Sequence, residues 1–476
     1  MSYTLGFTSL TSEVSDVSLD VRGDLPDWLQ GTLLRNGPAL FEVGSQRFRH
    51  WFDGLGMLHR FAFAGGAIRY SSRFLRSKAY ADAHRKGRIT RREFGTDPYR
   101  SYLRRITAPP TDNANVNVLQ LDGTYVATTE TVKMQEIRPD GLTTVGRLRY
   151  ERGPFGITQP AHPHLDPNTG EWISYVTSPV RSAYKVFRVP PGTRRAVPIA
   201  SVAAKEPAYI HSFALTESFV VLVEYPLVFR PVGLGLSGRP FIENFKWKPD
   251  RPTRLIVVGR LDGSLFRVYE TDPFFCFHHV NAFETPDELT IDLTHYPDDG
   301  IIRDLYLDRL RDPASQLELG EVRRYHLPRG GAEVTHEMLC RERADFPRIN
   351  LWLNAARYRY LYAAGTRSNP SDDFVNQLFK LDVDSGSVQT WFEDGCYPGE
   401  PVFVSASRDE AEDAGVILSV VLHVARGNSF LLVLDAAGFS ELTRAELPHH
   451  VPFGLHGQFF EQPGTERRLT PFGGRD

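Results

Sequence analysis

Cysteine is scarce in this 476-residue sequence, which contains only Cys276, Cys340 and Cys396. Three widely separated cysteines form neither a disulfide framework nor a CxxC metal site, and they indicate a reducing compartment. No apolar run approaches the roughly 18 residues of a membrane-spanning helix. The first ten residues, MSYTLGFTSL, lack the basic and apolar regions of a signal peptide. We therefore expect a cytoplasmic protein.

An excess of positive charge is also absent. Lysine and arginine total 55 against 58 aspartates and glutamates, for a formal charge of −3. A nucleic-acid-binding protein normally carries a basic face, so nucleic acid is not an expected partner. At about 150 residues per domain the length suggests three domains, but large all-β folds often exceed this size as one unit.

Most of the chain consists of short β-branched or aromatic runs that end in turn residues, and several are joined by turns of Asp and Gly, as in LQLDGTYVAT (119–128) and GRLDGSLFRVY (259–269). Such hairpins repeat over the whole length, which favours a β-propeller; a multi-sheet sandwich is the alternative. Helices are expected only at Ser315–Leu319 and around Asp304–Arg311. The clearest predicted strands are Tyr125–Thr131, Phe219–Leu227, Leu255–Leu261, Leu289–His295, Tyr360–Ala364 and Val416–Val424.

A Gly- and Pro-rich segment, Tyr225–Pro249, interrupts the rhythm of strands and mixes apolar residues with arginines and lysines. It fits a surface that dips into a membrane interface, with Phe229, Leu234 and Leu236 as the contact residues, and it fits a long loop packed on the propeller equally well. Residues 464–476 are expected to be a loose tail.

Histidine is plentiful, with 15 residues. Four lie at the edges of predicted strands in apolar, turn-flanked settings: His162, His211, His278 and His456. Their gaps of 49, 67 and 178 residues match no local metal motif, and spacing alone favours scattered histidines. A propeller would nevertheless bring them together, because its inner strands all approach one axis.

A series of motifs, in order, resembles the carotenoid cleavage oxygenase family from about Leu25 to Phe460, with the closest likeness to the animal-type branch of β-carotene 15,15′-oxygenases and the retinyl-ester isomerohydrolase. The resemblance implies one domain over residues 1–476, folded as an all-β, seven-bladed propeller with a cap of loops and short helices over an iron site. The motifs are LPDWLQGTLLRNGPALFEVG (25–44), HWFDGLGMLHRFAF (50–63), TDNANVNV (111–118), TTET (128–131), AHPHLDP (161–167), IHSFALT (210–216), FHHVNAFE (277–284), DFPRIN (345–350), YPGEPVFV (397–404) and FGLHG (453–457).

The resemblance also implies a set of site residues. The family's four Fe(II) ligands fall on His162, His211, His278 and His456. Its three ring-orienting acids fall on Glu130, Asp345 and Glu400, paired in that order with the last three histidines. Asp345 departs from the family pattern, which has Glu there, and its side chain is shorter by about 1.5 Å.

In the reaction implied by the resemblance, iron and O2 split one conjugated C=C bond of a carotenoid or apocarotenoid into two carbonyl products, without a catalytic acid or base. Conversion of β-carotene to retinal is the best single expectation, and a membrane-dissolved substrate adds weight to peripheral membrane contact. Tyr99 replaces the Cys of the isomerohydrolase, and Thr129 replaces the Lys that precedes the first acid in stilbene-cleaving members. Both activities are therefore disfavoured, and a non-catalytic propeller that binds an apolar ligand is the remaining alternative.

Overall fold

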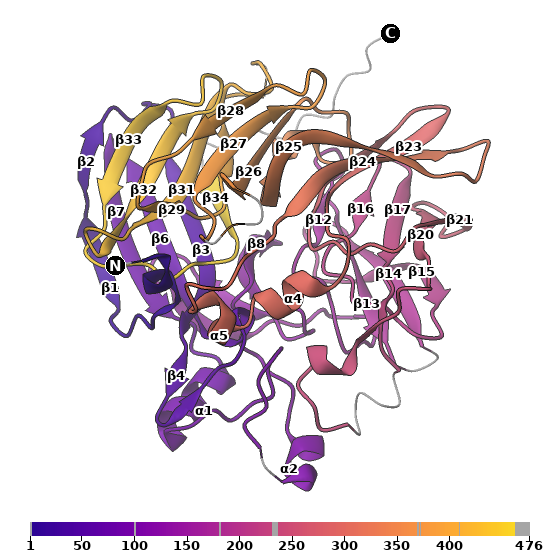
Figure 1. The fold of residues 1–476 in the computed structure, drawn as a ribbon, viewed down its shortest axis with the longest axis horizontal. Coiled ribbons are helices and arrows are strands. Elements are labelled where there is room, and N and C mark those ends of the chain that lie inside the picture. The colour runs from indigo at the N-terminus through magenta and orange to yellow at the C-terminus, as the bar shows by residue number, and fades with distance from the viewer. Residues whose placement is uncertain are drawn as a thin grey trace.

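Antiparallel β-sheets arranged around a common axis make up most of the molecule (Figure 1). This computed structural model describes residues 2–99, 101–179, 182–230, 237–368, 371, 373–408 and 410–461. The expected tail at 464–476 lies outside these residues. This arrangement confirms the predicted propeller. Its sheets are built largely from hairpins of the kind that the sequence predicts.

Three consecutive four-stranded sheets span residues 117–271. In the second and third of them the innermost strand has only two residues, and the two strands next to it are largely buried. In sheet order the strands are β8 (Asn117–Leu121), β9 (Thr124–Thr128), β10 (Gln135–Arg138) and β11 (Thr143–Arg147); β12 (His164–Leu165), β13 (Trp172–Ser178), β14 (Ala183–Val189) and β15 (Val197–Ala203); and β16 (Ala214–Leu215), β17 (Phe219–Glu224), β20 (Thr253–Gly259) and β21 (Leu265–Thr271).

A seven-stranded sheet contains two blades that share β25 (Thr335–Arg348). The start of β25 pairs with β24, and its end, from Arg343 to Arg348, pairs with β26. One strand therefore begins at the exposed edge of one blade and ends near the axis in the next. In order the strands are β22 (His279–Glu284), β23 (Glu288–His295), β24 (Gly320–Pro328), β25, β26 (Tyr360–Thr366), β27 (Gln377–Asp382) and β28 (Val388–Trp391).

The ring closes by an exchange of strands between the two ends of the chain. The C-terminal strand β34 joins the N-terminal sheet beside β3, and the N-terminal strand β2 joins the C-terminal sheet beside β33. Together with the sheets above, the described residues form seven blades, as predicted. The N-terminal sheet is β1 (Val14–Ser18), β7 (Ala67–Phe74), β6 (Leu55–Ala64), β3 (Gly31–Leu40) and β34 (Gly457–Glu461); the C-terminal sheet is β2 (Asp20–Gly23), β33 (Glu441–Glu446), β32 (Asn428–Asp435), β31 (Gly415–His423), β29 (Cys396–Pro398) and β30 (Val402–Ser405).

Local sequence explains both the hairpins and one wrong helix. Between β8 and β9, Asp122 and Gly123 both have positive φ, 51° and 68°, which is the two-residue turn that an Asp-Gly pair favours. The predicted helix around 304–311 is present as α4 (Gly300–Asp304) and α5 (Leu307–Leu310). Residues 315–319 are extended instead, because the backbone of Leu317 exchanges two hydrogen bonds with Ser371.

Short helices and loops cover one end of the ring, and α1 and α2 lie below the sheets in Figure 1. Helix α1 begins where the Ser77 side chain accepts a hydrogen bond from the amide of Tyr80, and it ends at Gly87 in a left-handed conformation. No helix among the described residues is long and apolar enough to cross a membrane. Helices α1 and α2 span Lys78–Lys86 and Tyr102–Thr107. The remaining short elements that the structure describes are η1 (Tyr3–Phe7), η2 (Trp51–Asp53), η3 (Ile242–Asn244), η4 (Leu351–Leu353), β4 (Glu42–Val43), β5 (Gln46–Arg47), β18 (Leu227–Val228) and β19 (Lys246–Trp247).

The described parts of the segment Tyr225–Pro249, residues 225–230 and 237–249, pack on the propeller. Phe229 is only 4% exposed, and its ring lies 4.8 Å from that of Phe245. The expectation that Phe229 contacts a membrane is therefore wrong, because its side chain is already buried in the core. Leu234 and Leu236, the other two expected contacts, lie outside the described residues.

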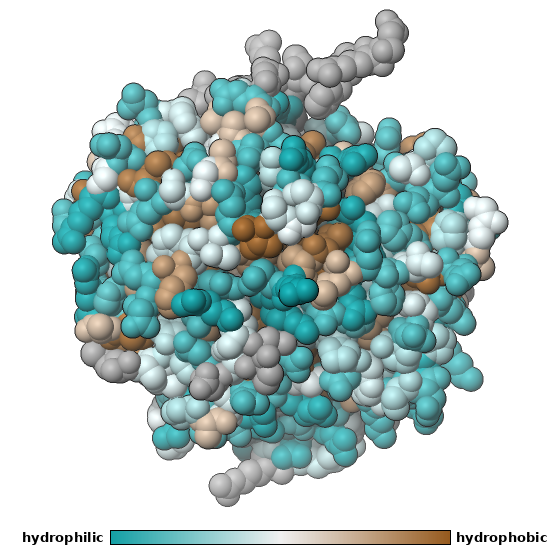
Figure 2. Space-filling model, turned by 45° about the horizontal axis from the view of Figure 1, so that its top comes forward, coloured by the Kyte–Doolittle hydropathy of each residue, from teal (hydrophilic) through white to brown (hydrophobic). Residues whose placement is uncertain are grey.

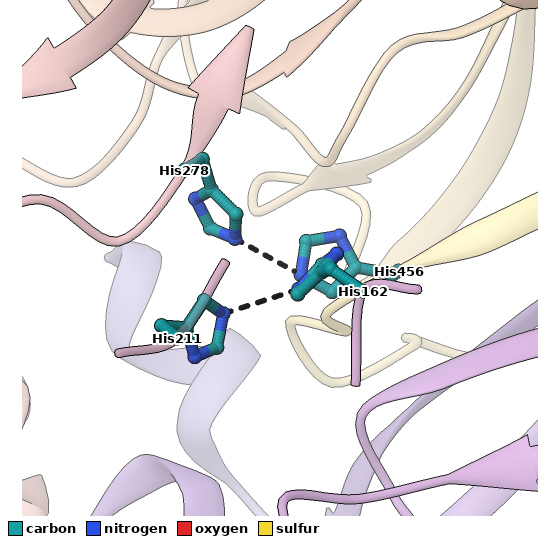
Figure 3. A group of neighbouring side chains, drawn as sticks. All are labelled: His162, His211, His278 and His456. Atoms are coloured by element: carbon teal, nitrogen blue, oxygen red, sulfur yellow. Dashed lines mark hydrogen bonds between the residues drawn. The ribbon is translucent and has the colours of Figure 1, made fainter. Parts of the chain in front are cut away.

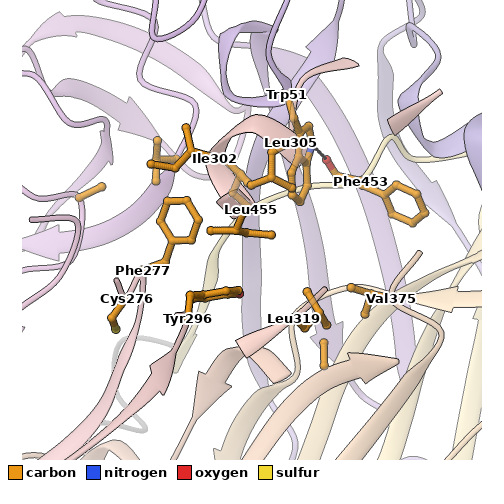
Figure 4. Packing of buried hydrophobic residues seen from close by; sticks show 14 of the residues in the cluster. Trp51, Cys276, Phe277, Tyr296, Ile302, Leu305, Leu319, Val375, Phe453 and Leu455 are labelled. Atoms are coloured by element: carbon orange, nitrogen blue, oxygen red, sulfur yellow. Dashed lines mark hydrogen bonds between the residues drawn. The ribbon is translucent and has the colours of Figure 1, made fainter. Parts of the chain in front are cut away.

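Aromatic and aliphatic side chains are concentrated inside the ring and under the cap. On the face shown in Figure 2 the described residues are mainly hydrophilic, and the apolar ones lie in small, separate patches. Figure 4 shows the interior, where Trp51, Phe277 and Leu305 approach one another from different segments. The indole N–H of Trp51 donates to the carbonyl of Phe453 at 2.9 Å, so its one polar atom is satisfied in this apolar setting.

Candidate metal centre

Four histidines from four blades meet near the axis (Figure 3). His162, His211, His278 and His456 each lie one to three residues before the innermost strand of a blade, namely β12, β16, β22 and β34. One ligand atom from each lies within 4.8 Å of the others. The propeller thus brings together residues that are as much as 294 positions apart in the chain.

The spacing and protonation of these rings suit a metal ion. The Nε2 atoms of His162 and His211 are 3.1 Å apart, and those of His278 and His456 are 3.3 Å apart. Adjacent nitrogens at right angles around one ion, each at about 2.1 Å from it, would be about 3 Å apart. Burial lowers the pKa of His456 to about 3 and that of His162 well below its ordinary value, so these rings are neutral and able to coordinate.

Three carboxylates fix the orientation of three of the rings. The Nδ1–H groups of His211, His278 and His456 donate to acidic side chains at 2.6, 2.5 and 2.7 Å. An ionised carboxylate only accepts hydrogen bonds, so Nδ1 carries the proton and Nε2 points its lone pair at the centre. The acceptors are the expected acids in the expected pairing: Glu130, Asp345 and Glu400. Among the described residues, His162 has no such partner.

Asp345 reaches its histidine directly despite its short side chain. The register of β25 shifts between Asp345 and Arg348, and the intervening Phe346 has a φ of 53°, a left-handed conformation that is rare for a bulky residue. A bulge in β25 therefore begins directly after Asp345, the residue that reaches His278. Burial alone would raise the pKa of Asp345, but His278 and the hydroxyl of Tyr296, which donates at 2.8 Å, lower it below its ordinary value.

Two arginines and two tyrosines complete the support of the centre, and the sequence reasoning did not single them out. Arg348 Nε donates to Glu400 at 2.8 Å, and Arg35 donates to the other carboxylate oxygen. Burial would raise the pKa of Glu400, yet Arg348, His456 and Arg35 together hold it far below its ordinary value. The hydroxyl of Tyr209 donates to Glu130 at 2.7 Å, as Tyr296 does to Asp345. Arg35 and Arg348 lie inside the LLRNGP and DFPRIN motifs, where a charged residue next to an apolar one was the available signal.

Two cavities meet at the histidines. A cavity of about 540 Å³ under the cap is mainly apolar, and His211, His278 and His456 form part of its wall. A second cavity of about 460 Å³ includes His162, His278 and His456 and is more polar, with Arg348 and Glu400 in its wall. The centre is therefore accessible to an apolar molecule from the cap side. The apolar wall of the first cavity includes Trp51, Phe52, Phe94, Phe277, Leu305 and Phe374.

Comparison with known proteins assigns the chain to a family. The family model described as "Retinal pigment epithelial membrane protein" matches residues 7–461, nearly the whole length. The chain belongs to the carotenoid cleavage oxygenase family. A carotenoid-cleaving dioxygenase of Macaca fascicularis, described as mitochondrial, is 34% identical over 95% of this chain and 93% of its own length. The β,β-carotene 15,15′-dioxygenase of Gallus gallus is 30% identical over 94% of this chain and 96% of its own.

Solved structures of the family share the fold. A mutant of Synechocystis apocarotenoid oxygenase superposes with a TM-score of 0.87 at 25% identity, covering 97% of this chain and 98% of that one. A cobalt-substituted form of the Synechocystis protein gives a TM-score of 0.86 at the same identity and coverage. The curated relatives described above are carotenoid-cleaving dioxygenases, and this chain is an enzyme of the same family.

Proposed function

We propose that His162, His211, His278 and His456 hold Fe(II) and that the protein uses O2 to cleave one conjugated C=C bond of a carotenoid or apocarotenoid. The observation that carries this proposal is the convergence of four neutral imidazoles at the wall of a mainly apolar cavity. The bound iron supplies the redox chemistry with O2. Two carbonyl products result, and β-carotene giving retinal is the substrate and product pair that we propose to test first.

The protein's own part in this reaction is to bind, orient and exclude water. Neutral ligands leave an Fe(II) ion with its full charge, unlike a site of two histidines and a carboxylate. The three carboxylates would not contact the ion themselves. They accept hydrogen bonds from the Nδ1–H groups of the ligand rings and so fix the tautomer in which Nε2 faces the ion. These carboxylates are Glu130, Asp345 and Glu400. Apolar walls place the polyene beside the ion and keep bulk water away from it.

The substrate class is supported by the cavity and by the relatives. An apolar wall with several aromatic side chains matches a rigid, conjugated hydrocarbon chain, and both curated relatives described above are named for carotenoid cleavage. The sequence itself argues against two other activities. Tyr99 stands where the isomerohydrolase has a cysteine, and Thr129 stands where stilbene-cleaving members have a lysine.

One experiment tests this function against the alternatives. Iron-loaded protein is incubated with β-carotene in the presence and absence of ¹⁸O2, and the products are identified by mass. Retinal that forms only with O2 and carries the label supports the proposal. A product that forms without O2 would indicate hydrolytic or isomerising chemistry, and no product from any polyene would indicate a binding protein.

We also propose that the cap touches the membrane from which the substrate is drawn. Tyr102 and Leu103 on α2 are 57% and 66% exposed, and Phe155, in the wall of the cap-side cavity, is 61% exposed. Arg104 and Arg105 in the last turn of α2 would lie at the level of anionic headgroups. This patch replaces Phe229 as the proposed contact.

A further inference from the structure

The apolar cavity under the cap contains one polar corner that the proposed reaction does not use. Arg92, Glu93 and Lys133 all contribute to the cavity wall. Arg92 and Lys133 are both tied to Pro110, the first through a backbone bridge and the second through a hydrogen bond from its ammonium group to the Pro110 carbonyl. The backbone of Arg92 and the ammonium group of Lys133 therefore both lie beside Pro110, and Glu93 follows Arg92 in the chain.

Among the described residues, Arg92 has no ion-pair partner. None of the ion pairs or side-chain hydrogen bonds of the described residues includes Arg92, and its buried Nε has no partner. A buried guanidinium nitrogen without an acceptor costs free energy, so its retention calls for an explanation. An acceptor oxygen supplied by a ligand in the cavity would satisfy it.

Glu93 is arranged as a hydrogen-bond donor. It is 4% exposed and lies within hydrogen-bonding reach of the Thr111 hydroxyl. Burial and the nearby carboxyl groups of Asp53 and Asp112 raise its pKa well above the ordinary value, which favours the protonated form that can donate a hydrogen bond. Both neighbouring carboxylates are occupied by backbone donors, Asp112 by the first amides of α1 and Asp53 by the amide of Gly95.

Lys133 adds a second positive charge. Partial burial lowers the pKa of its ammonium group. A hydrogen bond that the ammonium group donates to a ligand there is stronger than in water, because the local dielectric constant is lower. The corner therefore offers a guanidinium, an ammonium and a buried carboxyl group whose protonated form is favoured. All three are donors, and together they fit a group that only accepts hydrogen bonds.

We propose that Arg92, Glu93 and Lys133 form a subsite for a terminal carbonyl oxygen of the substrate. Within the proposed class of carotenoids and apocarotenoids, the subsite would favour a polyene that ends in an aldehyde or carboxylate over β-carotene, which has no such end group. This inference rests on the proposed function, because it assumes that the cavity holds a polyene. Binding of one end at the polar corner would also fix which double bond lies beside the histidines.

The test compares two substrates that differ at one end, β-carotene and a long-chain β-apocarotenal. For iron-loaded wild type and variants, kcat/KM is measured with O2, and Kd is measured under nitrogen from the quenching of tryptophan fluorescence. Wild type should favour the aldehyde. Arg92→Met and Lys133→Met should each reduce that preference about tenfold or more, the expected effect of losing a hydrogen bond from a charged donor.

Controls separate recognition from folding. Lys86→Met removes an exposed cation at the end of α1 and should leave the preference at its wild-type value. Glu93→Leu should reduce the preference and Glu93→Gln, which keeps a donor, should restore most of it, with circular dichroism confirming the fold of each variant. An unchanged preference in both Arg92→Met and Lys133→Met overturns the subsite. If wild type cleaves neither polyene, the proposed function fails, and the anaerobic Kd values still decide the subsite.

Discussion

Replacing Glu400 by Gln tests the electrostatic support of the metal centre. The Glu400 side chain is 1% exposed and accepts from His456, Arg348 and Arg35, and its Oε2 also accepts from the amide of Gly457 at 2.9 Å. Glutamine keeps the shape but removes the charge that both arginines face. Removal of one partner from a buried ion pair costs about 3–5 kcal/mol. Because one amide oxygen can still accept, we expect a loss near the lower end, about 3 kcal/mol.

The assay is urea denaturation of the metal-free protein at pH 7, followed by fluorescence. Asp384→Asn is the control, because Asp384 pairs with Arg357 on the surface, with side chains 44% and 75% exposed. An exposed pair contributes about 0–1 kcal/mol. Iron affinity of Glu400→Gln should also fall about 10–100-fold, since the tautomer of His456 is no longer enforced. A free energy of unfolding within about 1 kcal/mol of wild type would refute the reasoning.

The loss of stability in Glu400→Gln should depend on pH. The pKa of Glu400 is lowered in the folded state, so its contribution to stability is complete above the unfolded-state pKa of about 4.3 and is lost as the pH falls toward the folded-state value. The difference in stability between wild type and Glu400→Gln should therefore be constant from pH 7 to about pH 5 and narrow below that. A difference that widens on acidification would contradict the assignment.

Three further predictions address the ligands, their support and the membrane. His278→Ala should lose iron and cleavage together, whereas His326→Ala on β24 should keep both; stoichiometric iron in His278→Ala would show that the four-histidine assignment is wrong. Tyr296→Phe removes a hydrogen bond to the carboxylate beside His278 and should lower iron affinity about tenfold in a metal-competition assay, with unchanged affinity counting against the role of that hydroxyl. Leu103→Ser should weaken binding to anionic liposomes several-fold while Leu261→Ser, at a fully exposed hairpin turn, should not; equal binding by the two variants would remove α2 from the contact.

The fold was predictable because hairpins recur along the chain and each is encoded locally. The turn at Asp122 and Gly123 is an example. The candidate centre was not predictable from spacing, because no local pattern links His162 to His456, and only the order of the family motifs selected them. Tyr296 follows a strand and resembles any packing aromatic residue, so its hydrogen bond to Asp345 had no sequence signal.

The error at Phe229 has a different origin. A mixture of apolar and cationic residues has the same composition whether the apolar groups face lipid or face a protein core. Burial decides between these cases, and it is a property of the whole fold. Likewise, the contribution of β25 to two blades depends on pairing over distance, which a run of residues does not specify.

Because the ring is closed by strands from the two ends of the chain, a bound ion would stabilise the closed ring. His456 directly precedes β34, the strand that closes the ring against β3, while the other three histidines belong to blades in the middle of the chain. An ion held by all four would tie the closing strand to the opposite side of the ring. Because it binds only the closed ring, its binding free energy would oppose the peeling of β34. Amide hydrogen exchange in β34 should therefore slow when metal is added. The degree of slowing would measure how much the bound ion raises the free energy of opening the ring.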